Sequence, residues 1–221
     1  MSGELGAVLF DMDGTLVDTE GMWWQACVAV AAELGLELTE ADAGHVLGRL
    51  VEDAAGYLVR HLPPGAPGVA EVGARLTESF AGWVSGGVTP LPGAIRLLDD
   101  LKAEGVPTAL VSASPRLIVD MVLRGVGAER FALVLAAEDT ARGKPLPDPY
   151  LRAAAGLGLD PADCVAVEDS PTGLAAARAA GCRVVSVSGD PVAEDVLTVD
   201  SLEKVDVPLL RLLASGKRSL G

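Results

Sequence analysis

The second half of the chain alternates between short apolar runs and amphipathic segments. The apolar runs predict buried strands at residues 106–111, 131–136, 164–167 and 183–187. Apolar residues at helical spacing predict the helices that separate them, at residues 94–103, 115–124, 149–155 and 171–180. Short apolar strands with a helix between each pair are typical of a parallel sheet that helices cover on both faces.

The N-terminal part of the chain shows a different pattern. Residues 5–10 form an apolar run that ends at Asp11, as expected of a buried parallel strand. From residue 18 to residue 88 no strand is evident, and helices are expected at residues 23–34, 40–47, 52–61 and 69–84. We therefore predict an α/β protein with a Rossmann-like parallel-sheet core, residues 1–17 and 89–221, and an inserted all-α-helical domain, residues 18–88.

The composition narrows the candidate partners. Half of the residues are hydrophobic, which argues against disorder. The formal net charge of −14 implies a surface that repels nucleic acids and anionic lipids, so neither is expected as a partner. No apolar run is long enough to span a membrane, and no basic segment precedes the first apolar run. We expect a cytoplasmic monomer whose three cysteines are reduced and buried.

Polar residues follow the predicted strands at their carboxyl ends. They are Asp11 and Asp13, Ser112 and Ser114, Glu138 and Asp139, and Glu168, Asp169 and Ser170. Parallel sheets gather their chemistry at these ends, so the groups are expected to form one site, although Glu138 and Asp139 are more typical of a solvated turn and receive no role there. Several carboxylates in one place need a cation, and Mg²⁺ is the hard ion that best suits oxygen ligands without histidine or cysteine. Lys144 and Ser112 supply a charge and a hydroxyl suited to phosphate oxygens.

Four segments at these strand ends resemble, in order, the motifs of the haloacid dehalogenase-like hydrolases. They are Asp11-Met12-Asp13-Gly14-Thr15, then Val111-Ser112-Ala113-Ser114, then Gly143-Lys144-Pro145-x-Pro147-Asp148, and Glu168-Asp169-Ser170-Pro171-x-Gly173. The match spans about residues 5 to 190. It is closest to the phosphatase and β-phosphoglucomutase-like branch with an α-helical cap, and residues 18–88 correspond to that cap.

The resemblance implies a role for each of these residues. Asp11 would attack phosphorus and form an aspartyl-phosphate intermediate, while Asp13 would act as general acid and base. Ser112 and Lys144 would bind the transferring phosphoryl group. The ligands of Mg²⁺ would be Asp11, the backbone carbonyl of Asp13, Asp169 and, directly or through water, Glu168.

Two residues of the helical insertion are candidates for substrate contact. Arg49 and His45 lie four positions apart, so we expect them to share one face of a helix. The segment around Arg49 resembles one that contacts substrate in several sugar-phosphate members of the family. A surface ion pair is the simpler alternative. Trp23 and Trp24 are adjacent on a predicted helix, so at least one should pack in the interior.

These features favour a Mg²⁺-dependent phosphatase that hydrolyses a small phosphate monoester, such as a sugar phosphate. Asp13 argues against carbon–halogen cleavage, because the dehalogenases of the family lack this second acid. The first lysine of the chain is Lys102, beyond the insertion, which argues against the Schiff-base chemistry of the phosphonate-cleaving members. A β-phosphoglucomutase-like sugar phosphomutase is the alternative, and an inactive phosphate-binding module is a further one.

Overall fold

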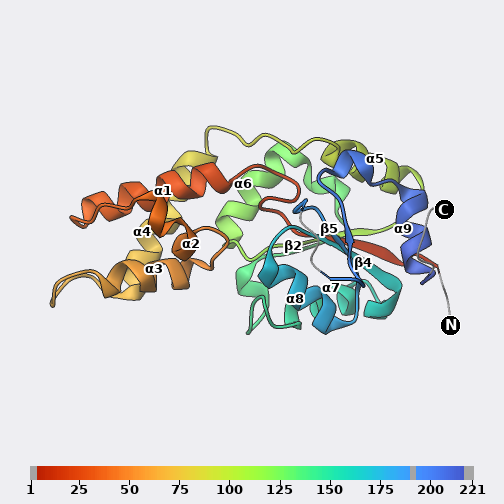
Figure 1. Ribbon diagram of the computed structural model, residues 1–221. Helices are drawn as coiled ribbons and strands as arrows, with labels where there is room; N and C mark the ends of the chain where they lie inside the picture. Colours follow the sequence, from red (N-terminus) through yellow and green to blue (C-terminus); the bar gives the residue numbers. More distant parts are fainter. Residues whose placement is uncertain (1–3, 190–192, 217–221) are drawn as a thin grey trace.

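A parallel β-sheet forms the centre of the computed structural model, which describes residues 4–189 and 193–216 (Figure 1). Its six strands follow the order β3-β2-β1-β4-β5-β6, and every neighbouring pair is parallel. The strands are β1 (Ala7–Phe10), β2 (Thr108–Val111), β3 (Leu133–Leu135), β4 (Cys164–Glu168), β5 (Arg183–Ser186) and β6 (Leu197–Thr198). The predicted α/β fold with a parallel sheet is confirmed.

Helices cover both faces of this sheet. They are α5 (Ala94–Ala103), α6 (Arg116–Val126), α7 (Asp148–Gly156), α8 (Pro171–Ala180) and α9 (Val207–Ala214). Val8 and Phe10 of β1 point into a core shared with α5, α6 and α9, whereas Ala7 and Leu9 point into a second core with α7 and α8. Both faces of β1 are therefore buried, which explains its uninterrupted apolar sequence.

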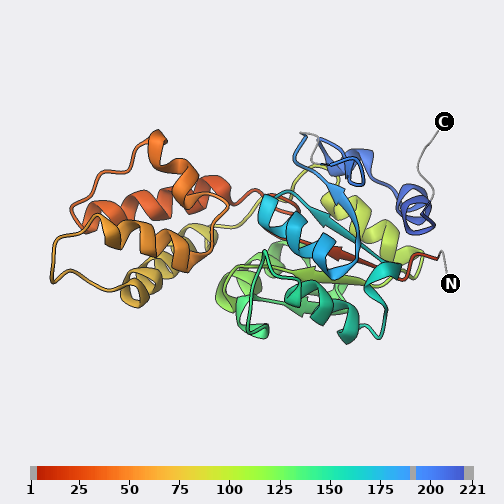
Figure 2. The ribbon, with the colours of Figure 1, turned by 60° about the horizontal axis from the view of Figure 1, so that its bottom comes forward.

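Four further helices lie to one side of the sheet (Figures 1 and 2). They are α1 (Glu20–Glu33), α2 (Ala43–Val46), α3 (Val51–Arg60) and α4 (Val69–Val84). Trp23 of α1 and Phe80 of α4 are largely buried, and their rings meet edge to face with centroids 5.3 Å apart. All four helices fall between residues 18 and 88, and we propose these positions as the limits of a helical cap domain.

The two chain segments that join the helices to the sheet run beside each other. Val17 forms an antiparallel bridge with Pro90. The backbone N–H of Asp18 donates to the carbonyl of Thr89 (3.2 Å), and that of Leu91 donates to the carbonyl of Leu16 (2.9 Å). The outgoing and returning segments thus form a short two-stranded ribbon.

The structure differs from the predictions in several local features. The predicted helix at residues 40–47 is a 3₁₀ turn followed by α2, which ends at Val46 because Leu47 is extended and Gly48 has a φ of +62°. His45 and Arg49 therefore do not share a helix face, and Arg49 lies in the loop before α3. Strand β6 and helix α9 were not predicted. The three cysteines are unpaired and buried, as expected. Among the described residues, no helix is long and apolar enough to cross a membrane.

Candidate active site

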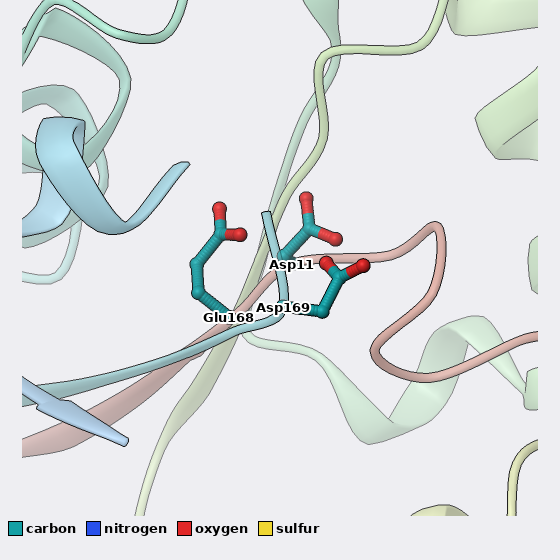
Figure 3. A group of neighbouring side chains, drawn as sticks. All are labelled: Asp11, Glu168 and Asp169. Atoms are coloured by element: carbon teal, nitrogen blue, oxygen red, sulfur yellow. The ribbon is translucent and has the colours of Figure 1, made fainter. Parts of the chain in front are cut away.

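Three carboxylates meet at the carboxyl ends of β1 and β4, and Figure 3 shows them projecting from the same end of the sheet. Phe10 pairs in register with Val167, so Asp11 emerges beside Glu168, the last residue of β4, and Asp169 follows directly. One oxygen each of Asp11, Glu168 and Asp169 lies within 4.8 Å of the others. The pairing of the two central strands brings these acids together from positions more than 150 residues apart in the sequence.

A buried lysine neutralises part of this charge. Lys144 Nζ lies 2.5 Å from Asp11 Oδ1 and 2.5 Å from Glu168 Oε1. Tyr150, which is fully buried, donates its hydroxyl to the same Glu168 oxygen (2.7 Å). The backbone N–H and hydroxyl of Ser170 donate to Glu168 Oε2 at 3.3 and 3.0 Å. Both oxygens of Glu168 are thus occupied by protein donors, which fixes this carboxylate at the base of the site.

Hydroxyl groups hold Asp13. Thr19 Oγ1 donates to its Oδ1 (2.6 Å), and Ser114 Oγ donates to its Oδ2 (2.7 Å). Ser112 Oγ is 3.5 Å from the same oxygen, which is long for a hydrogen bond. Burial raises the pKa of Asp13 above its usual value, while the bonds from Thr19 and Ser114 oppose this rise. Asp13 is therefore a fixed carboxyl group whose pKa is shifted toward the range of a general acid.

Burial also raises the pKa values of the other acids. The pKa of Asp11 lies well above its usual value because of burial and the nearby Glu168 carboxylate, against which Lys144 acts. The same two causes raise the pKa of Asp169 to about 7. Burial alone would lower the pKa of Lys144, but Asp11 and Glu168 more than offset this effect and raise it. A divalent cation relieves such repulsion, and a donor set made only of oxygens suits a hard ion.

A cavity of about 350 Å³ lies between these strand ends and the helical group. This size is in the range of pockets that bind small molecules. The core side contributes Asp11, Asp13, Ser114, Lys144, Asp169 and Thr172, and the helical side contributes Glu20, Trp23, Arg49, Leu50, Asp53 and Phe80. Asp11, Asp13, Asp169 and Lys144 therefore open onto a space large enough for a metabolite, whereas Glu168 lies behind them and is fully buried.

The candidates for substrate contact are separated by the structure. Arg49 lines the cavity, whereas His45 is absent from its lining and stacks on Tyr57 with ring centroids 4.6 Å apart. Trp23 lines the cavity, and Trp24 is half-buried elsewhere. The structure thus brings only one residue of each pair to the site.

Several residues at the site received no role in the sequence analysis. Ser114 was among the polar residues that follow a predicted strand, so its place at the site could be predicted. Its hydrogen bond to Asp13 could not, because that contact depends on the three-dimensional fold. Thr19 precedes α1 and reaches Asp13 only through the fold of the connecting segment. Tyr150 lies in the first turn of α7, where its ring centroid is 5.3 Å from Lys144 Nζ. Glu138 and Asp139, which also follow a predicted strand, do not line the cavity and contact Arg116 instead.

The fold and the site together are those of an α/β enzyme with a buried, acidic site at the carboxyl ends of its central strands. The chain belongs to the haloacid dehalogenase-like hydrolase family, whose model matches residues 5–181.

Relatives and solved structures agree with this assignment. The chain is 36% identical to hexitol phosphatase A of Escherichia coli, over 90% of this chain and 92% of that protein. It is 35% identical to protein CbbY of Rhodobacter capsulatus, over 82% of this chain and 85% of the relative. A structure of a CbbY variant from Rhodobacter sphaeroides in complex with xylulose-1,5-bisphosphate superposes with a TM-score of 0.84, at 26% identity, and covers 93% of this chain and 99% of its own.

Proposed function

We propose that this protein is a Mg²⁺-dependent phosphatase that hydrolyses a small phosphate monoester, such as a sugar phosphate, through an aspartyl-phosphate intermediate. The observation that carries the proposal is the buried contact of Lys144 with Asp11, beside Asp169 and at the floor of a cavity. A relative named hexitol phosphatase A, and a CbbY structure with bound xylulose-1,5-bisphosphate, support this substrate class.

In this mechanism Asp11 attacks phosphorus. Its carboxylate oxygen forms the new P–O bond while the bond from phosphorus to the ester oxygen breaks, which gives an aspartyl phosphate and an alcohol. Lys144 and Ser112 hold the non-bridging oxygens of the transferring group. Lys144 thereby reduces the repulsion between an anionic nucleophile and an anionic substrate.

Asp13 serves as the acid and then as the base. In the first step it donates its proton to the departing ester oxygen, for which its raised pKa is suited. In the second step it takes a proton from the water that attacks phosphorus, and Asp11 and inorganic phosphate are released. Thr19 and Ser114 keep both of its oxygens in place between the two steps.

The residues present fit a magnesium ion. Asp11, Asp169 and the backbone carbonyl of Asp13 would hold it, all through oxygen atoms, as Mg²⁺ prefers. Glu168 would contribute through water, because protein donors already occupy both of its oxygens. When bound, the ion supplies positive charge that neutralises the phosphoryl oxygens and lowers the repulsion among the carboxylates.

The same residues would serve a β-phosphoglucomutase-like reaction if a sugar hydroxyl, instead of water, accepted the phosphoryl group from Asp11. A β-phosphoglucomutase of Clostridium difficile has the same fold, with a TM-score of 0.81 at 21% identity. We favour hydrolysis because Thr15 follows Gly14 in the first motif and because the curated relatives include phosphatases.

The test is phosphate release from a panel of sugar and nucleotide monophosphates with Mg²⁺, with isomerisation of β-glucose 1-phosphate followed in parallel. Asp11→Asn and Asp13→Asn should each lose at least about a hundredfold in rate, as expected for an essential nucleophile and an acid–base group. Asp18→Asn is the matched control, because Asp18 lies in the same segment, is exposed and does not line the cavity. Near wild-type turnover in Asp11→Asn would refute the mechanism. Failure of the wild type on every substrate, in both assays, would favour a phosphate-binding module.

A further inference from the structure

The helical side of the cavity combines acidic and aromatic side chains. Glu20 and Asp53 stand on it as carboxylates, Arg49 as a single cation, and Trp23 and Phe80 as an aromatic wall. This wall lies opposite the groups that would act on phosphorus, so it faces the part of a substrate that does not react. Its chemistry therefore bears on which phosphate esters the site accepts.

The carboxylates of Glu20 and Asp53 have no partner side chain in the described part of the chain. They lie in the first turns of α1 and α3, where a carboxylate ordinarily interacts with the helix dipole. Within residues 4–189 and 193–216, neither side chain forms an ion pair or a hydrogen bond with the protein. Both are exposed, and both border the same cavity from different helices. Their oxygens are thus free to accept hydrogen bonds from a ligand.

The cations of the cavity do not balance these acids. Lys144 already contacts two carboxylates on the core side. Arg49 is the other cationic side chain that lines the cavity in the described part of the chain, and its guanidinium lies 3.3 Å from the carbonyl of Gly44. A second phosphate on the helical side would meet two carboxylates and one guanidinium. Like charges placed in this way discriminate against a ligand, here a bisphosphate.

The aromatic wall is rigid. Trp23 donates its indole N–H to the carbonyl of Val46 (2.8 Å), and its ring packs against Phe80. A fixed aromatic surface suits the C–H face of a carbon chain, while the carboxylates beside it accept hydrogen bonds from hydroxyl groups. The two features together match a polyol more closely than an alkyl chain or a second anionic group.

We infer that the site selects phosphate monoesters whose far end donates hydrogen bonds and carries no second negative charge, with Glu20 and Asp53 as the specificity-determining acceptors. The inference rests on the proposed phosphatase activity and goes further by naming the class of leaving alcohol. It also separates this chain from a relative whose structure holds a sugar bisphosphate.

The experiment compares kcat/KM for three substrates in Mg²⁺: sorbitol 6-phosphate, fructose 1,6-bisphosphate and hexyl phosphate. The wild type should favour the polyol monophosphate over each of the others by at least about tenfold, as charge and hydrogen-bond mismatches of this kind produce. Glu20→Gln and Asp53→Asn should each reduce the ratio of polyol phosphate to bisphosphate by about three- to tenfold. Glu52→Gln removes the same charge from α3 outside the cavity lining, and the ratio should not change.

The outcomes separate the two proposals. If phosphate is released from none of these three substrates and from no member of a wider panel, the proposed phosphatase function itself is overturned. Release of phosphate with a preference for the bisphosphate would overturn the inference while leaving that function intact. An unchanged ratio in the double variant Glu20→Gln/Asp53→Asn, shown by circular dichroism to be folded, would also overturn it.

Discussion

Replacement of Asp169 by asparagine should stabilise the metal-free protein at alkaline pH. Asp169 is mostly buried beside Glu168, and the pKa of its carboxyl group is raised from 3.8 to about 7. Because the pKa is higher in the folded state than in the unfolded state, the folded protein binds this proton more tightly. Stability from this group is therefore present below pH 4 and is lost as the pH rises toward 7.

The size of the effect follows from that shift. A shift of about 3 pKa units corresponds to about 4 kcal/mol above pH 7, at roughly 1.4 kcal/mol per unit. The repulsion among the carboxylates also involves Asp11 and Glu168, which can adjust when Asp169 is neutral. We therefore expect the variant to exceed the wild type by about 2–4 kcal/mol in the free energy of unfolding. Asparagine is neutral at every pH and retains an oxygen that can accept the hydrogen bond from Thr15, which is 3.1 Å long in the wild type.

The assay is urea denaturation at pH 5, 6.5 and 8, in EDTA and in saturating Mg²⁺. In EDTA the variant should be more stable than the wild type at pH 8, by an amount that declines toward pH 5. Saturating Mg²⁺ should stabilise the wild type by about 3 kcal/mol at a hundredfold excess over Kd and the variant by much less. Asp18→Asn, an exposed control, should show no such dependence. An Asp169→Asn variant that is less stable than the wild type at pH 8 in EDTA would refute this reasoning.

Three further predictions concern neighbouring groups. Tyr150→Phe removes a buried donor to Glu168 and should lower the free energy of unfolding by about 1–2 kcal/mol in urea titrations. Gly173→Ala places a Cβ against the Glu168 carboxylate and should cost about 1–3 kcal/mol in the same assay. Ser114→Ala removes one of the bonds that hold Asp13 and should lower kcat by about tenfold, measured as phosphate release, with little change in KM.

Each of these has a control or a contrary result. Gly82→Ala lies in α4 with no heavy atom near its added Cβ, so it should stabilise the protein slightly. If Gly173→Ala did the same, the close packing at Glu168 would be wrong. Full stability of Tyr150→Phe would show that its hydroxyl bond contributes nothing. A change in KM alone for Ser114→Ala would place that residue in substrate binding instead of acid–base positioning.

The alternation of apolar runs and amphipathic segments predicted the parallel sheet because its central strands β1, β2 and β4 are short, mainly apolar and buried at every position. The strand ends predicted where the polar groups would gather, and Asp11, Glu168 and Asp169 lie there together. Their chemical roles stay predictions. The signal was strong because both the strand pattern and the residues that follow each strand pointed to one edge of the sheet.

Tertiary contacts could not be predicted from local pattern. Tyr150 reaches Glu168 because α7 packs against β1, β2 and β3, and its sequence position on an apolar helix face gives no hint of a hydrogen bond. The helix expected to join His45 and Arg49 stops at Val46, because Leu47 is extended and Gly48 has a left-handed φ. Helix α9 did carry signals, namely Asp206 as an N-cap that accepts from the Leu209 N–H and a proline in its first turn.

The ribbon formed by Val17 and Pro90 bears on how such a protein diversifies. The chain leaves the sheet and returns to it at one place. The intervening helices can therefore be lengthened, shortened or exchanged without a change in the distance between the two points where they join the sheet domain. Asp11 and Asp13 precede the ribbon, and Ser112, Lys144 and Asp169 follow it. A chimera that carries a relative's helices on this sheet should therefore inherit that relative's choice of substrate while it retains the chemistry of the recipient.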